Sequence, residues 1–239
     1  MRRLTCCLWG ATKCWKTTFA LGWPGPIEFF DFNHGLEGVI EDIHRDDIAF
    51  HAYRKPLFGG HDERKALLDR FRNDYAKAMN AALKRPAAEQ GTFVIDTATE
   101  LDDLAKSVTL EEIRVHKYNA KKEPEDFQAQ ARDYGPRNEF METVIMAPLG
   151  APGLNAVFIH QDADIWEGME NTGRIRLAGW KRTPKQTQIT IEAFRPSPKE
   201  NPQGRLYNCR LGKGLNKLAE GLVLAELSYE FLSGILEEE

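Results

Sequence analysis

A segment near the start of the chain has the residue types and spacing that could bind a chain of phosphates. It reads GATKCWKT at positions 10–17, close to the pattern GxxxxGK[ST]. In that pattern, backbone N–H groups surround phosphate oxygens, a lysine ammonium reaches the outer phosphates and a hydroxyl ligates magnesium. Lys16 and Thr17 would take the last two roles. The residues expected to contact such a ligand are Gly10, Thr12, Lys13, Cys14, Trp15, Lys16, Thr17 and Thr18.

The segment departs from the pattern at Trp15, where the pattern requires glycine. Glycine there lets the backbone approach phosphate closely and adopt unusual dihedral angles, which a bulky side chain does not do easily. Lys13 does not restore a variant with a lysine directly after the first glycine, because Ala11 occupies that position. Two interpretations therefore stay open: a working phosphate loop, and an ordinary turn between a strand and a helix.

Other polar side chains follow apolar runs in the order that a phosphate loop requires. Asp96 ends the run TFVID, where a carboxylate could hold magnesium together with Thr17. Capping the helix that follows is the alternative role for this carboxylate. The runs 27–32 (IEFFDF) and 155–160 (NAVFIH) also lead into polar residues. Ligands of open α/β sheets bind at this rim, so these side chains are expected to meet there.

Hydrophobic patterning indicates which elements position these residues. Short apolar runs predict buried strands at 4–9, 27–32, 92–96 and 155–160. Apolar residues at helical spacing predict helices at 16–21, 63–84, 100–116, 139–147 and 215–236. Runs at hairpin spacing predict further strands at 174–177, 188–194 and 205–211. The charged segment 119–136 is expected to be a mobile loop.

This order of elements predicts an α/β fold. A mainly parallel central sheet should be flanked by helices, with antiparallel strands added toward the C-terminus. A length of 239 residues suits a single domain. We expect it to consist of a core at 1–165, a β-rich extension at 166–212 and a C-terminal helix at 213–239.

Composition excludes several classes of protein. With 42% hydrophobic and 28% charged residues, the chain is not disordered, and its net charge of -4 excludes a globally basic nucleic-acid binder. The cysteines contain no CxxC pair, which favours buried free thiols in a reducing cytosol over a zinc site. The apolar run at 4–9 is too short for a signal peptide or a membrane span, so we expect a cytoplasmic protein without membrane contact.

Taken in order, the phosphate loop, FFDFNHGLE, FVIDTATEL, VFIHQ and the β-rich tail resemble the RecA-like P-loop NTPases. The resemblance is closest to short phage and prophage RecA-like ATPases of single-strand-annealing recombination, and it covers roughly residues 4–195. It implies ATP and Mg²⁺ as ligands, held by Lys16, Thr17 and Asp96. Gln161 would be the glutamine that senses the terminal phosphate.

Hydrolysis is the point at which this chain departs from the family. In RecA-like enzymes an acidic residue at the end of the second strand polarises the attacking water, and Asn33 occupies the matching position here. An amide cannot accept a proton as a carboxylate does. Asp31 and Glu37 are the candidate substitutes. The resemblance therefore implies nucleotide binding and leaves hydrolysis open.

The resemblance also implies DNA contacts through loops that follow the central strands. One such loop contains cations and an aromatic residue without an intervening acid: Arg174, Arg176, Trp180, Lys181, Arg182 and Lys185. Cations neutralise backbone phosphates, and an indole can stack on an unpaired base. A solvated hairpin of alternating charge is the other interpretation, because four acidic residues precede the cluster.

Two functions are carried forward. The first is an ATP-binding RecA-like protein that acts on single-stranded DNA in phage-type recombination or annealing, as a ring or filament and with a single-strand-binding or recombination protein as a further partner. The second is a P-loop scaffold that has lost nucleotide chemistry and serves as an interaction or DNA-loading module. Trp15 and Asn33 are the residues that motivate the second.

Overall fold

The computed structural model describes residues 3–34, 36, 39, 43–54, 60–118, 129–197, 200, 201, 203–209, 221–225 and 228–237. Its strands are β1 (Thr5–Gly10), β2 (Ile27–Asp31), β3 (Ile48–Ala52), β4 (Thr92–Asp96), β5 (Asn155–Glu167), β6 (Glu170–Leu177), β7 (Ile189–Phe194), β8 (Gln203–Cys209) and β9 (Val223–Leu224). Its α-helices are α1 (Lys16–Leu21), α2 (His61–Leu83), α3 (Ala98–Tyr118), α4 (Gly135–Leu149), α5 (Thr183–Gln186) and α6 (Tyr229–Glu237).

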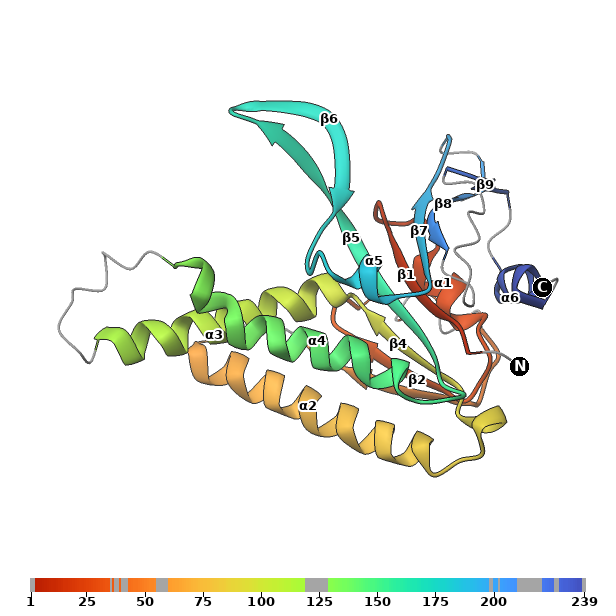
Figure 1. Cartoon of the computed structure of the whole chain (residues 1–239), viewed down its shortest axis with the longest axis horizontal. Coiled ribbons are helices and arrows are strands. Elements are labelled where there is room, and N and C mark those ends of the chain that lie inside the picture. The colour runs from red at the N-terminus through yellow and green to blue at the C-terminus, as the bar shows by residue number, and fades with distance from the viewer. Residues whose placement is uncertain are drawn as a thin grey trace.

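These strands form a mixed sheet in the order β3-β2-β4-β5-β1-β7-β8-β9. Neighbours from β3 to β7 are parallel, whereas β8 and β9 are added antiparallel at the far edge. The end of β5 leaves the sheet and pairs antiparallel with β6, and this hairpin projects from the body of the protein (Figure 1). The predicted fold class is confirmed.

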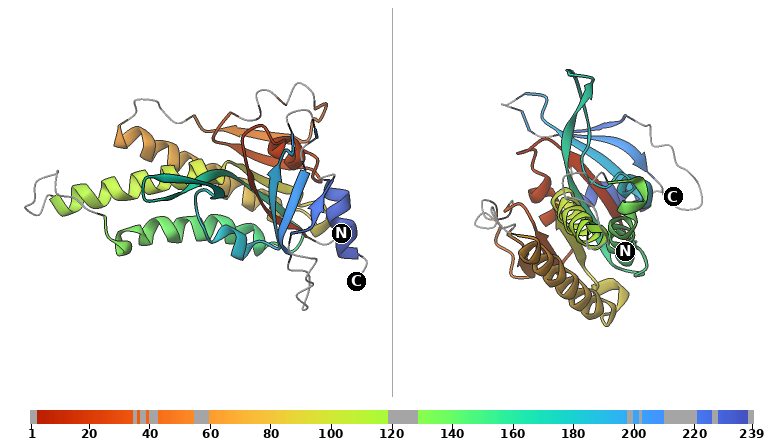
Figure 2. Two further views of the ribbon diagram at one scale, coloured as in Figure 1. Left: turned by 90° about the horizontal axis from the view of Figure 1, so that it is seen from above. Right: turned by 90° about the vertical axis from the view of Figure 1, so that its left-hand side faces the viewer.

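Helices cover both faces of the sheet because the central strands alternate their apolar side chains between two cores. Phe93 and Ile95 of β4 pack with α2, α3 and α4, whereas Val94 packs with α1 and α6. In β5, Phe158 and Val157 divide between the two cores in the same way. The helices α2, α3 and α4 lie side by side as one layer (Figure 2). Strands buried on both faces explain the continuous apolar runs in the sequence.

One strand was missed by the sequence analysis, and one predicted helix begins earlier than expected. Strand β3 was not predicted, because it lies at the sheet edge and its side chains are partly exposed, which weakens its apolar pattern. Helix α4 begins at Gly135 rather than 139, with Pro136 in its first turn, where a missing N–H costs nothing. The expected loop before it lies partly at 119–128, outside the described residues.

The helix expected at 215–236 is wrong for the described residues that precede Tyr229. Gly221 adopts a φ of 94° and starts a turn, after which Val223–Leu224 forms β9 against β8. Helix α6 begins only at Tyr229. Residues 210–220 lie outside the described residues.

Strand β5 is much longer than its buried apolar run. The strand spans 13 residues, of which Asn155–His160 are buried and the rest are exposed or half-buried. The expected border between core and extension, at 165/166, therefore falls within one continuous strand. The extension was not predicted because residues 162–167 pair only with β6 and do not form a continuous apolar run.

Two further expectations concern cysteines and membranes. Cys6, Cys7 and Cys14 are buried free thiols, as predicted. Burial also raises the pKa of the Cys7 thiol, which keeps it protonated and unreactive. No helix in the described part of the chain is both long and apolar enough to cross a membrane.

Candidate phosphate-binding site

The candidate site lies where the parallel strands end at one rim of the sheet. Gly10 at the end of β1 pairs with Gln161 on one side and with Ala193 on the other. Asp31 and Asp96 lie opposite each other at the ends of β2 and β4. A cavity of about 670 Å³ opens at this rim. It is lined by Thr12, Lys13, Cys14, Trp15, Lys16, Thr17, Thr18, Asn33, Val39, Asp96, Thr97, Gln161 and Arg195.

The structure brings together nearly all the residues that the sequence assigned to this site. Apart from Gly10, every residue predicted to contact nucleotide, magnesium or the terminal phosphate lines the cavity. Gly10 lies behind it, with a φ of 141°, and a Cβ there would come within 2.0 Å of the Ala193 carbonyl oxygen. Glycine is therefore needed where β1 passes β7 and turns into the loop.

Lys16 points back into its own loop. Its Nζ donates hydrogen bonds to the carbonyl oxygens of Gly10 at 2.7 Å and Ala11 at 2.6 Å. Burial lowers the pKa of this ammonium, and the nearby Asp96 carboxylate partly opposes that shift. The charge is thus desolvated at the cavity wall and held by neutral carbonyls, which an anionic oxygen would readily replace.

Thr17 and Asp96 meet at the floor of the cavity. The Thr17 hydroxyl donates a hydrogen bond of 2.6 Å to Asp96 Oδ2. Burial raises the pKa of Asp96 to about 6, the Thr17 hydrogen bond opposes the shift, and Asp31 adds to it. A desolvated carboxylate beside a hydroxyl is an arrangement that a bound cation would stabilise, so these two oxygens fit a magnesium ion.

Magnesium would nevertheless need most of its ligands from elsewhere. Among the described residues, no group of three or more His, Cys, Asp or Glu side chains gathers in a way that could hold a metal. Magnesium commonly keeps waters and binds through one or two protein oxygens plus substrate phosphates. The donor set therefore suits a magnesium–nucleotide complex rather than a free metal ion.

Trp15 adopts the backbone conformation that glycine would supply. It is the N-cap of α1, with φ 56° and ψ 21° in the left-handed region, and Lys13 has a φ of 65°. Such dihedral angles cost a residue with a side chain about 1–2 kcal/mol. The indole is 55% exposed and forms part of the cavity wall. Trp15 thus adopts, at a steric cost, a backbone conformation that glycine adopts without strain.

A second, smaller cavity adjoins the first across the same loop. It measures about 390 Å³ and shares Cys14, Trp15, Lys16 and Thr18 with the larger one. Its other walls include apolar side chains of the sheet and of α1, together with Tyr229 at the start of α6. Trp15 therefore lines both the larger and the smaller cavity.

The candidates for activating water have different surroundings. Asn33 lines the cavity, but Asp31 does not, because its carboxylate accepts backbone hydrogen bonds from Asn33 at 3.0 Å and Leu36 at 3.4 Å. Glu37 lies outside the described residues. Of the described residues that line the cavity, Asp96 is the only carboxylate.

A buried network joins the cavity to the base of the hairpin. The Gln161 backbone N–H donates to Thr99 Oγ1 at 3.0 Å, and Thr99 Oγ1 donates to the Ala178 carbonyl oxygen at 3.1 Å. His160 Nδ1 lies 3.0 Å from the same carbonyl oxygen. Burial lowers the pKa of His160 to about 4, so the ring is neutral at physiological pH. The two ends of the hairpin are thereby fixed beside Gln161.

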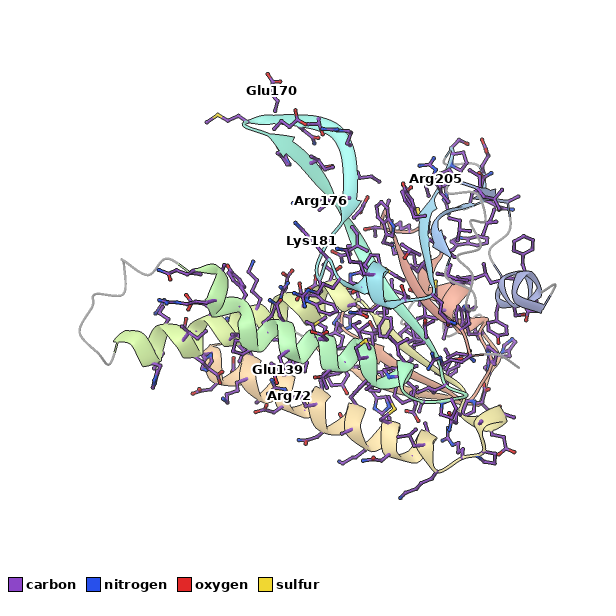
Figure 3. All side chains as sticks on the ribbon, viewed as in Figure 1. Arg72, Glu139, Glu170, Arg176, Lys181 and Arg205 are labelled. Atoms are coloured by element: carbon purple, nitrogen blue, oxygen red, sulfur yellow. The ribbon has the colours of Figure 1, made fainter. Side chains whose placement is uncertain are left out.

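The predicted DNA cluster is only partly available. Trp180 is 2% exposed within the core formed with α3 and α4, so the expectation that its indole stacks on a base is wrong. Arg174 forms an ion pair with Glu167, and Arg182 lies 3.5 Å from Glu142. Arg176 and Lys181 lie near the base of the hairpin (Figure 3). Lys185 is in the short helix α5.

Exposed apolar side chains do occur on the hairpin, but at other positions. Trp166 is 59% exposed near the end of β5, and Met169 is 96% exposed in the turn. Trp166 lies among acidic residues in the sequence, whereas Trp180 lies among basic ones, so Trp180 was predicted to stack on a base. Trp166 is exposed because β5 has left the main sheet by that point and pairs with β6 alone, so its exposure follows from the unpredicted length of the strand.

Sequence reasoning missed three cavity residues, Val39, Thr97 and Arg195, of which Arg195 is the charged one. It directly follows β7, the strand beside β1. The rule applied to the other strands, that polar residues beyond an apolar run lie at the ligand-binding rim, would have selected it.

Comparison with known proteins gives a likeness of fold only. No protein-family model matches the chain, and no curated protein matches it. Among solved structures, it resembles the RadB recombinase. The TM-score is 0.46 at 11% identity, over 93% of this chain and 86% of the RadB chain. At this level the resemblance to RadB does not extend to function or to individual residues.

The left-handed backbone at Trp15 can be tested by comparing two substitutions. Trp15→Gly should give a free energy of unfolding about 1 kcal/mol higher than Trp15→Ala, because only glycine removes the steric cost of this conformation. The same pair at Trp166, within a strand, should show the reverse order. Urea denaturation of the four variants measures both differences. An alanine variant at position 15 as stable as the glycine variant would contradict the described loop.

The buried Asp96 carboxylate should make stability depend on pH. Its folded pKa of about 6 lies above the unfolded value, so ionisation costs stability as pH rises from about 4 to 6. Asp96→Asn should therefore unfold with a free energy about 1–3 kcal/mol higher than wild type at pH 8, and with an equal one at pH 4. The titration of the buried His160 also changes stability with pH, but it does so equally in wild type and in Asp96→Asn. Equal stability at pH 8, measured without nucleotide or magnesium, would contradict a desolvated carboxylate.

Proposed function

We propose that this chain is a RecA-like ATP-binding protein that binds ATP together with Mg²⁺. The observation that carries the proposal is the convergence of Lys16 and the hydrogen-bonded pair Thr17–Asp96 on one cavity of about 670 Å³. An ammonium, a hydroxyl and a carboxylate at this spacing match the three tasks of gripping phosphate, ligating magnesium and positioning that magnesium.

Each of these residues has a distinct task. The Lys16 ammonium would leave the carbonyls of Gly10 and Ala11 and bind the outer phosphates. Thr17 and Asp96 would hold the magnesium ion, which when bound neutralises phosphate charge. Gln161, at the end of the β1–β5 pair, would contact the terminal phosphate. The smaller cavity beyond Trp15 and Thr18 has room for the base.

Hydrolysis by the isolated chain should be slow. Asn33 lines the cavity where an acidic residue would polarise water, and an amide is not a general base. Asp96 is needed for the metal ion. We therefore propose that the chain binds ATP, and that ATP hydrolysis requires a general base from outside the described cavity. A nucleotide-dead scaffold remains the competing function, and direct binding measurements separate the two.

Single-stranded DNA is the proposed partner, at the hairpin formed by β5 and β6. Arg176 and Lys181 supply cations near its base, and the exposed Trp166 offers a stacking surface in place of Trp180. The network of Thr99, His160 and Ala178 connects this hairpin with the cavity. Phage-type recombination, assembly into a ring or filament, and a recombination protein as partner stay predictions from the sequence.

Nucleotide binding is tested with a fluorescent ATP analogue and magnesium. Wild type should bind it, and Lys16→Ala should weaken binding by about thirtyfold or more, because a buried charge that faces phosphate is lost. Lys84→Ala, an exposed lysine at the end of α2, is the matched control and should bind like wild type. If wild type and Lys16→Ala ignore the analogue equally, the proposal is wrong and the scaffold function is favoured.

DNA binding is tested with a labelled single-stranded oligonucleotide over a range of salt concentrations. Arg176→Ala combined with Lys181→Ala should weaken binding and reduce the slope of log affinity against log salt by about 1–2. Trp166→Ala should weaken binding by about 1–3 kcal/mol with little change in that slope, because stacking is lost rather than charge. Arg72→Ala on α2, far from the hairpin, is the control (Figure 3). Unchanged affinity in all variants would exclude this surface.

A further inference from the structure

Arg195 approaches the cavity from the side opposite to the magnesium residues. It follows β7, which pairs with β1, whereas Asp96 ends β4 and Gln161 lies on β5, both across β1. All three side chains line the same cavity. A ligand that extends through this space would therefore meet Asp96 near one end and Arg195 near the other.

The guanidinium of Arg195 makes few hydrogen bonds within the described part of the chain. Nη2 donates one long hydrogen bond of 3.3 Å to the Lys13 carbonyl oxygen. Nε is shielded from solvent and has no hydrogen-bond partner among the described residues. A buried N–H without a partner is costly, and arginine carries five donors in a fixed fork. Arg195 also lines the cavity, so an anionic oxygen bound there could accept hydrogen bonds from the accessible part of its guanidinium.

A triphosphate carries more charge than one ammonium neutralises. Lys13 and Lys16 both line the cavity, and the charge of Lys16 is partly offset by the nearby Asp96 carboxylate. Arginine recognises phosphate through two parallel hydrogen bonds, which a lysine does not form. The smaller cavity proposed for the base is lined in part by Ala193 of β7, so the phosphates nearest the ribose would lie on the β7 side of the loop, where Arg195 lines the larger cavity.

We propose that Arg195 binds the phosphates nearest the ribose of the nucleotide, from within the same chain and independently of magnesium. This inference rests on the proposed nucleotide-binding function and assigns one further residue to it. The competing explanation is that Arg195 only holds the loop through the Lys13 carbonyl oxygen.

ADP affinity in the absence and presence of magnesium separates these explanations. Arg195→Lys keeps a charge, whereas Arg195→Gln keeps an N–H donor for the Lys13 carbonyl without a charge. Arg195→Ala and Arg195→Gln should each weaken ADP binding by about tenfold or more, with or without magnesium. Arg195→Lys should recover most of the loss. Arg72→Gln, an exposed arginine on α2, should leave ADP affinity unchanged.

Three results would overturn the inference. Recovery by Arg195→Gln equal to that by Arg195→Lys would show a role in holding the loop. ADP affinity within about twofold of wild type in all three variants would show no role in binding. A loss seen only with magnesium would place Arg195 at the terminal phosphates instead. Melting temperatures without nucleotide confirm that each variant is folded. Failure of the wild type itself to bind ADP would reject the proposed function rather than Arg195 alone.

Discussion

The hydrogen bond between Thr17 and Asp96 is the interaction on which the candidate site depends. It joins the first turn of α1 to the end of β4 across the rim of the sheet, although the two residues are 79 positions apart in the chain. Only the order β4-β5-β1 places them together, with β5 between the two segments. Burial at this rim raises the pKa of Asp96, whereas the hydrogen bond from Thr17 lowers it. The sheet order therefore sets both the contact and the environment of this carboxylate.

The site carries several features that oppose stability. Trp15 and Lys13 occupy left-handed backbone, Lys16 and Asp96 are buried ionisable groups, and Arg195 has a shielded N–H without a described partner. Buried ionisable groups also occur elsewhere, at Asp102, His160 and Glu192. Left-handed backbone next to buried charges is the combination found at the cavity, and strained backbone is often retained where function requires a fixed arrangement.

The sequence predicted the parallel core because its strands are buried on both faces and read as continuous apolar runs. It predicted the cavity residues through the rule that polar side chains follow such runs. It failed where a residue's environment depends on distant segments. Trp180 sits in a basic, polar stretch, yet it is buried against α3 and α4, whereas Trp166 in an acidic stretch is exposed. Edge strand β3 and the turn at Gly221 likewise depend on neighbours that no local pattern reveals.

The continuity of β5 has a geometric consequence. The strand is held in the sheet up to Gln161 and then extends to Glu167 with a single partner strand. At about 3.3 Å per residue, its outer half reaches about 20 Å beyond that point. The hairpin therefore carries the exposed Trp166 and Met169 well away from the cavity, while hydrogen bonds hold its two ends beside Gln161.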